Sequence, residues 1–418
     1  MSDPSSNSNI LSFEDARRVV EQETSGVQPG EIESVRLLAV AGRVLAEPIT
    51  ADRDLPPFPR STRDGYALRA ADLTRIPATL RVVGEIKAGE KQDPVPQGVE
   101  PGQAVSIMTG ASVPAGADAV VMVEYTSRRG EHVEIARSAA PGENVVPRGA
   151  EARQGSLLLD RGLRLNDAAI ALAASVGRSS LQIYRRPRIA VLATGDEIID
   201  INATPGPTQI RNSNSYSLAA QILHAGAEPV VLPVAPDKAP ALRRLIERGF
   251  KSDLLVLTGG VSMGRYDLVE HVLSQMHAEF FFTGAKIQPG RPVVFGECGS
   301  GGDGRSVRYF FGLPGNPVST MVTFDLFVRP MVEALAGQSP RKLLFLHARL
   351  KEEIRIKTGL RRFLPAILSG EFDNSRVQLV PWQGSGDIAA LSRANCYLVI
   401  PEDRDLISAG EWVAVMPR

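Results

Sequence analysis

Between residues 186 and 338 the chain alternates short apolar runs with segments of helical spacing. Uninterrupted apolar runs, typical of strands covered on both faces, occur at 189–193, 229–232, 254–257 and 309–311. Helical segments are expected at 215–224, 239–248, 267–275 and 318–335, and two further strands at 278–282 and 292–296. This alternation predicts βαβ units and an α/β domain built on a parallel sheet.

The flanking segments have other patterns. We expect helices at 12–23, capped by Ser12, at 34–46, and at 167–176, capped by Asn166, and we expect these helices to pack together. Apolar runs separated by Pro and Gly at 80–83, 104–108 and 119–123 predict a small β-rich domain inserted between them. Short strands at 343–350, 362–368, 376–380, 396–401 and 412–416 predict a C-terminal barrel or sandwich.

These patterns divide the 418 residues into four regions. The expected divisions are a helical N-terminal and linker region (1–54 and 146–185), an inserted β-rich domain (55–145), an α/β domain (186–338) and a C-terminal β domain (339–418). A chain of this length is too long for one ordinary domain, which agrees with that division.

The composition limits the classes of binding partner and the cellular compartment that we expect. Lys plus Arg and Asp plus Glu both number 47, so no global basic field favours nucleic acid or an anionic membrane. The two cysteines, Cys298 and Cys396, fit no metal-binding spacing or disulfide framework, which indicates a reducing compartment. Residues 1–9 lack the pattern of a signal peptide, and no apolar run reaches membrane-spanning length. We therefore expect a cytoplasmic protein that does not contact membranes.

Candidate chemistry gathers where the predicted parallel strands end, the edge at which open α/β sheets bind ligands. Glycines there let a ligand approach the backbone, and carboxylates supply hard oxygens that suit Mg²⁺ with bound phosphate. Each carboxylate alone is better explained as a helix cap or a solvated charge, but their convergence on Gly-rich strand ends favours a ligand site. The residues concerned are Thr194, Gly195, Asp196, Glu197, Asp237, Gly259, Gly260, Ser262, Asp267, Pro314, Gly315, Asn316 and Pro317.

Three other segments carry two interpretations each. Arg211–Asn214 precedes a helix, where Ser213 or Asn214 is either an N-cap or a ligand contact. Lys286 and Arg291 either meet an oxyanion or lie at a solvated hairpin end. Asp64 follows a proline-rich extended loop and is either a positioned functional group, like Thr109, or part of a simple turn. The five histidines do not cluster, so covalent acyl transfer is not supported.

Taken in order, these motifs resemble the MoeA family of molybdopterin molybdenumtransferases, which is related to the gephyrin and plant Cnx1 E domains. The resemblance rests on Pro56-Pro57-Phe58, Asp64-Gly65-Tyr66-Ala67, Met108-Thr109-Gly110-Ala111, Thr194-Gly195-Asp196-Glu197, Thr258-Gly259-Gly260-Val261-Ser262-Met263-Gly264, Leu313-Pro314-Gly315-Asn316-Pro317-Val318-Ser319, Gly384-Ser385-Gly386 and Ala394-Asn395-Cys396. Together they span nearly the whole chain.

The resemblance implies an elongated homodimer with a helical N-terminal region, an inserted β domain, a MogA-like α/β domain and a C-terminal β-barrel. It further implies that adenylylated molybdopterin and molybdate react between the α/β domain of one subunit and the inserted domain of the other, releasing AMP with Mg²⁺. Implied protein partners are a MogA-like adenylyltransferase and molybdoenzyme-maturation proteins.

Family positions can be carried over residue by residue. Asp64, Thr109, Glu197, Asp237 and Asp267 fall on active-site positions, the last three as Mg²⁺ ligands. Pro314 and Pro317 fall in the loop that shapes the pterin-side pocket, and Ser385 matches a serine at the cleft rim.

Two cationic family positions are altered, since Val146 and Gln288 stand where relatives often carry Arg and Lys, and Glu151 stands where Asp is usual. Arg148, Lys286 and Arg291 are the candidate replacements. The alternatives are a MogA-like adenylyltransferase, a CinA-like nucleotide hydrolase and a gephyrin-like peptide-binding scaffold. The long N-terminal part with Asp64 and Thr109 argues against the two enzyme alternatives, as does the string Gly259-Gly260-Val261-Ser262. The intact candidate carboxylates argue against the scaffold. The sequence does not separate molybdate from tungstate.

Overall fold

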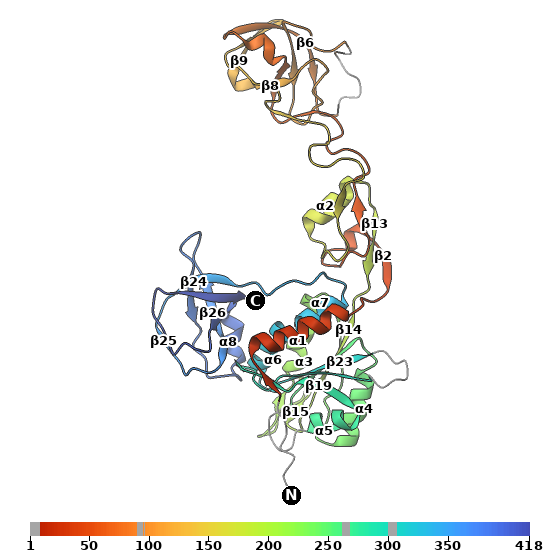
Figure 1. Cartoon of the computed structure of the whole chain (residues 1–418), viewed down its shortest axis with the longest axis vertical. Coiled ribbons are helices and arrows are strands. Elements are labelled where there is room, and N and C mark those ends of the chain that lie inside the picture. Colours follow the sequence, from red (N-terminus) through yellow and green to blue (C-terminus); the bar gives the residue numbers. More distant parts are fainter. Residues whose placement is uncertain (1–8, 90–94, 96, 261–267, 300–306) are drawn as a thin grey trace.

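A computed structural model describes residues 9–89, 95, 97–260, 268–299 and 307–418. The molecule is elongated, with the α/β domain and the C-terminal barrel at one end and the inserted β domain at the other (Figure 1). A narrow middle region that contains α2, β2 and β13 joins the two ends.

The α/β domain is built on a six-stranded sheet with the order β17-β14-β18-β23-β22-β19. The strands β17, β14, β18 and β23 are parallel. Strand β22 pairs antiparallel with both β23 and β19, so the sheet is mixed and not wholly parallel. All six predicted strands are confirmed. The bounds are β14 (Arg188–Ala193), β15 (Ile198–Ile199), β16 (Ile210–Arg211), α3 (Asn214–His224), β17 (Glu228–Val231), α4 (Ala239–Gly249), β18 (Leu254–Thr258), α5 (Leu268–Gln275), β19 (Ala278–Phe282), β20 (Gly284–Ala285), β21 (Ile287–Gln288), β22 (Val294–Cys298), β23 (Arg308–Leu313), α6 (Pro317–Thr323), the π-helical turn η4 (Phe324–Val328) and α7 (Arg329–Leu335).

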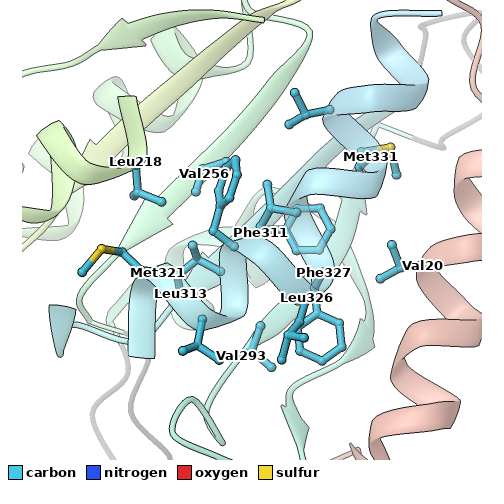
Figure 2. Close-up of a cluster of buried hydrophobic side chains, with 14 of the residues drawn as sticks. Val20, Leu218, Val256, Val293, Phe311, Leu313, Met321, Leu326, Phe327 and Met331 are labelled. Atoms are coloured by element: carbon cyan, nitrogen blue, oxygen red, sulfur yellow. The ribbon is translucent and has the colours of Figure 1, made fainter. Parts of the chain in front are cut away.

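Helices cover both faces of this sheet, so its central strands are continuously apolar. On one face α3 and the continuous α6–η4–α7 helix bury the cluster drawn in Figure 2, where Phe311 and Leu313 of β23 meet Phe327 and Met331. On the other face α4 and α5 bury Leu242, Ile246, Val269 and Val272 against the sheet. Two packed layers hold the strand ends in place from both sides.

The first helix, α1 (Phe13–Gly26), belongs to this packing. Phe13, Ala16 and Val20 lie in the core with Leu326 and Phe327, and Figure 2 shows Val20 facing that cluster. The expectation that α1 packs with the helix near residue 170 is therefore wrong. Ser12 caps α1 as predicted, accepting from the N–H of Asp15 at 3.0 Å, and β1 (Ile10–Leu11) pairs with β20.

The middle region corrects a second expectation. The segment predicted as a helix at 34–46 forms a strand and a 3₁₀ turn, because β2 pairs antiparallel with β13 and Val35 lies opposite Leu181. Leu38, which completed the apparent helical spacing, is 98% exposed. The elements are β2 (Ile32–Arg36), η1 (Leu37–Ala39), β3 (Ile49–Thr50), β12 (Leu157–Leu159), α2 (Asp167–Ser175) and β13 (Ser180–Tyr184), with α2 capped by Asn166 as predicted.

The inserted domain is a six-stranded sheet with the order β8-β5-β7-β6-β10-β9. The predicted strands correspond to β6, β7 and β8, but β5 was missed although it lies between β8 and β7. A Cβ at Gly65, where β5 begins, would lie inside the Val121 carbonyl, so only glycine fits there. The elements are β4 (Arg60–Ser61), β5 (Gly65–Leu68), η2 (Ala70–Leu73), β6 (Ala78–Ile86), β7 (Gln103–Ile107), β8 (Ala119–Met122), η3 (Val123–Tyr125), β9 (Thr126–Arg129), β10 (His132–Ile135) and β11 (Val145–Val146).

The C-terminal region is a closed barrel, because β26 pairs with both β27 and β28 while β24 and β30 complete the ring. The strand β21 of the α/β domain extends it by pairing with β26. Its elements are β24 (Leu346–Leu350), β25 (Ile354–Arg355), β26 (Arg361–Ser369), β27 (Arg376–Leu379), α8 (Ile388–Arg393), β28 (Cys396–Ile400), β29 (Leu406–Ile407) and β30 (Trp412–Pro417). Within the described part of the chain, no helix is long and apolar enough to cross a membrane.

Candidate functional site

A cavity of about 740 Å³ opens at the carboxyl ends of β14, β18 and β23. In sequence order β14 is followed by β17 on one side and by β18 on the other, so the cavity lies where the strand order reverses. That position is the usual ligand site of an open α/β sheet. Its lining residues are Ala193, Thr194, Glu197, Ile198, Ile210, Arg211, Asn212, Ser213, Asn214, Thr258, Gly259, Gly260, Pro292, Pro314, Gly315, Asn316, Pro317, Gly386 and Ile388. We call this space the strand-end cavity.

Backbone hydrogen bonds hold the three strand ends together. The Thr194 N–H donates to the Thr258 carbonyl at 3.0 Å, and the Gly259 N–H donates to the Leu313 carbonyl at 3.2 Å. Gly259 has a φ of +87°, and a Cβ on it would stand 2.6 Å from the Thr194 carbonyl oxygen. Only glycine therefore lets β18 turn this close to β14, which leaves the floor of the cavity as bare backbone.

Asn214 fastens α3 to this floor. Its amide nitrogen donates to the Thr258 hydroxyl at 2.9 Å and to the Gly315 carbonyl at 2.8 Å. Ser213 occupies the N-cap position of α3, but its side chain makes no capping hydrogen bond; instead the Asn212 side chain accepts from the Ser215 N–H at 3.1 Å. The capping interpretation is right for the position of Ser213 but not for its side chain, and Asn214 instead bonds to two strand ends.

Three of the acidic candidates, Asp196, Glu197 and Asp237, lie together beyond the end of β14. Glu197 lines the strand-end cavity and is exposed, with its carboxylate folded back over Gly195. Asp196 and Asp237 hold each other, since each backbone N–H donates to the other's carboxylate, at 3.4 and 3.1 Å. Asp267 and Ser262 lie outside the described residues.

Among the residues that the structure describes, no three His, Cys, Asp or Glu side chains gather closely enough to hold a metal ion. Mg²⁺ is commonly held by one or two carboxylates together with substrate phosphates. The exposed carboxylates of Glu197 and Asp237 fit a cation that arrives with a phosphate-bearing ligand better than one held by the protein alone.

A second cavity of about 670 Å³ adjoins the first and shares Pro292, Pro314 and Asn316 with it. We call it the interdomain cavity, because its walls come from the α/β domain and from the barrel. Arg291, Lys357 and Arg362 bring positive charge, and none of its described lining residues is acidic. Its lining residues are Ile287, Gln288, Pro289, Gly290, Arg291, Pro292, Pro314, Asn316, Ser319, Lys357, Thr358, Leu360, Arg362, Trp382, Gly384 and Ser385.

Arg362 is the buried cation of this cavity, with 7% of its surface exposed. The amide oxygen of Gln288 accepts from its Nε at 2.8 Å, and the Leu360 carbonyl accepts from Nη1 at 3.1 Å. Burial lowers the pKa of Arg362 from its ordinary value. Gln288, one of the altered family positions, thus orients an arginine supplied by the barrel.

Of the three candidate replacement cations, Arg291 alone lines the interdomain cavity. Arg148 is paired with Asp54 at 2.8 Å, and the side chain of Lys286 lines neither cavity. Nothing in the local sequence marked Lys357, Arg362 and Trp382, and all three were missed. They lie more than sixty residues beyond Arg291 in another domain, and the pairing of β21 with β26 and a shared apolar core bring them close.

Asp64 and Thr109 form a separate site at the far end of the molecule. One carboxylate oxygen of Asp64 accepts from the Thr109 N–H at 2.6 Å and from the Thr109 hydroxyl at 2.7 Å. These bonds, the backbone one first, lower the pKa of Asp64 from its usual value and so keep this exposed carboxyl ionised. In Figure 1 the inserted domain is separated from the α/β domain by the middle region, so this pair does not meet the strand-end cavity of its own chain.

Comparison with known proteins accounts for nearly the whole chain. Residues 11–177 match the model described as "MoeA N-terminal region (domain I and II)", residues 190–334 match "Probable molybdopterin binding domain", and residues 347–417 match "MoeA C-terminal region (domain IV)". The chain belongs to the MoeA family. The resemblance seen in the sequence is therefore confirmed.

Relatives of this MoeA-family chain match it over most of its length. Two curated proteins named molybdopterin molybdenumtransferase, from Nostoc sp. and Bacillus subtilis, are each 32% identical to it. The alignments cover 92% and 93% of this chain and 88% and 90% of those proteins. A crystal structure of a molybdopterin biosynthesis MoeA protein from Pyrococcus horikoshii OT3 superposes with a TM-score of 0.76 at 27% identity and covers 98% of this chain and 100% of its own. A second crystal structure, of a molybdopterin biosynthesis MoeA protein from Pyrococcus horikosii, superposes with a TM-score of 0.69 at 33% identity and covers 98% of this chain and 99% of its own.

Proposed function

We propose that the protein inserts molybdate into adenylylated molybdopterin, with release of AMP, to give the molybdenum cofactor. The observation that carries this proposal is the pair of adjoining cavities: one floored by bare backbone at the strand ends, the other lined by cations without an acidic residue among its described positions. A phosphoanhydride needs backbone N–H groups and a cation at its oxygens, whereas a doubly charged oxyanion needs positive side chains. The named activity of the curated relatives agrees.

In this proposal the strand-end cavity holds the adenylylated substrate. Thr194, Gly259, Gly260, Gly315 and Asn316 line it. Because the N–H groups of Thr194 and Gly259 already donate within the sheet, the phosphates would contact the turn at Gly315 and Asn316, which Pro314 and Pro317 keep rigid. Glu197, Asp237 and Asp267 would hold Mg²⁺ together with the phosphates, and Asp196 is next to Glu197 in sequence. Bound there, Mg²⁺ would neutralise charge that develops on the phosphate oxygens.

The interdomain cavity receives the oxyanion. Arg362 is fixed in direction by Gln288, while Arg291 and Lys357 are exposed and add charge at the entrance. Ser385 and the buried Ser319 offer hydroxyl donors from the two opposite walls. Lys286 serves only as a nearby charge. Tungstate has the same charge and shape, so competition between the two oxyanions belongs in the assay.

The position of Asp64 and Thr109 favours a homodimer in which each site is completed by the inserted domain of the second subunit. Closed two-fold dimers are the commonest assembly and would supply two such sites. We further propose that the protein acts in the cytoplasm on a small-molecule substrate and exchanges it with an adenylyltransferase and with molybdoenzyme-maturation proteins.

The test is AMP release from adenylylated molybdopterin by the purified protein with Mg²⁺, with and without molybdate. We expect release to depend on molybdate and to fall at least tenfold in Asp64→Asn and in Arg291→Gln. Arg355→Gln, a charge loss on the exposed barrel surface, is the matched control and should leave release unchanged. Adenylylation of molybdopterin from ATP would instead support the adenylyltransferase alternative, and hydrolysis that ignores molybdate would support the hydrolase.

A further inference from the structure

A buried carboxylate lies in the long helix behind both cavities. Asp325 is in the π-helical turn η4, between α6 and α7, and has 4% of its surface exposed. A π-helical turn disturbs the regular hydrogen-bond pattern of a helix and is frequently found at functional sites. The same turn presents the Leu326 carbonyl to the Arg17 guanidinium of α1 at 2.6 Å, so η4 is a junction for several elements.

Asp325 bonds to three elements at once. The hydroxyl of Tyr397, in strand β28 of the barrel, donates to Oδ2 at 3.1 Å. The Gln221 amide of α3 donates to Oδ1 at 3.0 Å, and Arg329 of α7 forms an ion pair with the same oxygen. The bond to Tyr397 is the one that crosses from the α/β domain to the barrel.

That crossing lies against the interdomain cavity. The helix that carries Asp325 begins at Pro317, directly after the turn that lines both cavities. Tyr397 lies opposite Pro365 in the pairing of β28 with β26, the strand that also carries Arg362. The Asp325–Tyr397 bond therefore joins the helix of one cavity wall to the strand pair of the other.

Apolar packing and the pairing of β21 with β26 already hold the two domains together. Phe363, Leu391 and Val399 of the barrel lie in the same core as Phe327 and Met331. Burying a charged group in such a core costs desolvation, and apolar replacements of buried ion pairs are often neutral or stabilising. The Asp325–Tyr397 bond adds a buried directional contact on the helix side of the cavity, besides those that β21 and Gln288 make with β26.

We propose that Asp325 and Tyr397 are positioning residues that set the separation of the two walls of the interdomain cavity and thereby its affinity for the oxyanion. The identity of that oxyanion rests on the proposed function. Neither residue lines the cavity, so both act through the placement of Arg362, Lys357 and Ser385 relative to Arg291 and Ser319.

Tyr397→Phe tests this by removing one hydroxyl and keeping the ring. Tyr309→Phe is the matched control, because the Tyr309 hydroxyl also donates to a carboxylate at 3.1 Å, that of Glu23, and lines neither cavity. We expect Tyr397→Phe to raise the KM for molybdate roughly tenfold, the scale of one hydrogen bond to a charged group. The kcat at saturating molybdate should change by less than about twofold, since the strand-end cavity is untouched.

A second measurement does not depend on activity. Amide hydrogen exchange should quicken at 357–362 and 382–386 in Tyr397→Phe, and should stay unchanged at 254–260 beside the strand-end cavity. Asp325→Asn should give the same two results and replaces Tyr397→Phe if that variant does not fold.

The outcomes separate the two proposals. An unchanged KM for molybdate, or an equal rise in Tyr309→Phe, would overturn the positioning role. If the wild type proves indifferent to molybdate, the proposed function fails, and hydrogen exchange decides: faster exchange confined to the barrel wall supports the positioning role, and unaltered exchange refutes it.

Discussion

Replacing Gly259 with alanine should destabilise the α/β domain far more than two similar replacements in the same domain. Gly315→Ala needs no positive φ and brings its Cβ only to 3.5 Å from Gly259 Cα. Gly226→Ala needs a φ of +92° but meets nothing closer than 3.9 Å. Gly259→Ala needs a φ of +87° and also places a Cβ 2.6 Å from the Thr194 carbonyl oxygen.

The three sites separate two costs. A non-glycine residue at positive φ costs about 1–2 kcal/mol, offset by about 0.4–1 kcal/mol from the stiffer unfolded chain. Forcing a methyl group into a packed backbone adds about 1–3 kcal/mol. We therefore expect a loss within about 0.5 kcal/mol for Gly315→Ala, about 1 kcal/mol for Gly226→Ala and about 2–4 kcal/mol for Gly259→Ala.

Urea unfolding followed by far-UV circular dichroism would measure these differences. Because the protein has several domains, amide hydrogen exchange in β14 and β18 should identify which transition belongs to the α/β domain. If Gly259→Ala lost no more stability than Gly226→Ala, the close approach of β18 to the Thr194 carbonyl would not constrain that position, and glycine would not be needed at the cavity floor.

Three further results are expected. Burial raises the pKa of Cys396 to about 11 from an ordinary 9.0. The stability that the buried neutral thiol contributes is therefore complete below pH 9 and is lost as the pH rises through 11, so the difference in unfolding free energy between wild type and Cys396→Ala should narrow over that range. A constant difference in urea unfolding at these pH values would contradict this. Thr109→Val removes the hydroxyl donor but keeps the backbone N–H, so the pKa of Asp64 should rise part of the way to its usual value; a carboxyl ¹³C titration that matches wild type would count against it. Phe363→Ala removes a fully buried ring that packs 5.1 Å from Phe13, and should cost about 3–5 kcal/mol in urea unfolding followed by tryptophan fluorescence; a loss below about 1 kcal/mol would show that this contact does not hold the barrel.

Much of the α/β domain could be predicted because its central strands are buried on both faces. Continuous apolar runs such as the one within Leu254–Thr258 are typical of strands covered on both sides, and the glycines that follow them mark the ligand edge. The local sequence pattern predicted the wrong secondary structure where pairing with a strand far away in the sequence decides the conformation. Residues 34–46 have helical spacing, yet β13 offers a strand to pair with β2 almost 150 residues later.

The residues of the candidate site also fall into two groups, those that local sequence motifs identify and those that only the fold brings together. Thr194, Glu197, Gly259, Gly260 and the Pro314–Pro317 turn are local features of strand ends, so sequence sufficed to bring them together. Arg291 of the interdomain cavity was a candidate from the sequence, but Lys357 and Arg362 come from a barrel strand and its preceding loop, where no local motif marks them. The role of Gln288 was likewise hidden, because its partner Arg362 is known only from the fold.

The length of the molecule has a genetic consequence. Asp64 is in the inserted domain and Glu197 is in the α/β domain, and these domains lie at opposite ends of the folded molecule. In the proposed dimer the two residues therefore meet only between subunits. An Asp64→Asn subunit paired with a Glu197→Gln subunit would hold one doubly altered site and one intact site. Mixing the two inactive variants equally, under conditions that exchange subunits, should therefore restore about a quarter of wild-type activity. Two alleles that each abolish the activity would complement one another when expressed in the same cell.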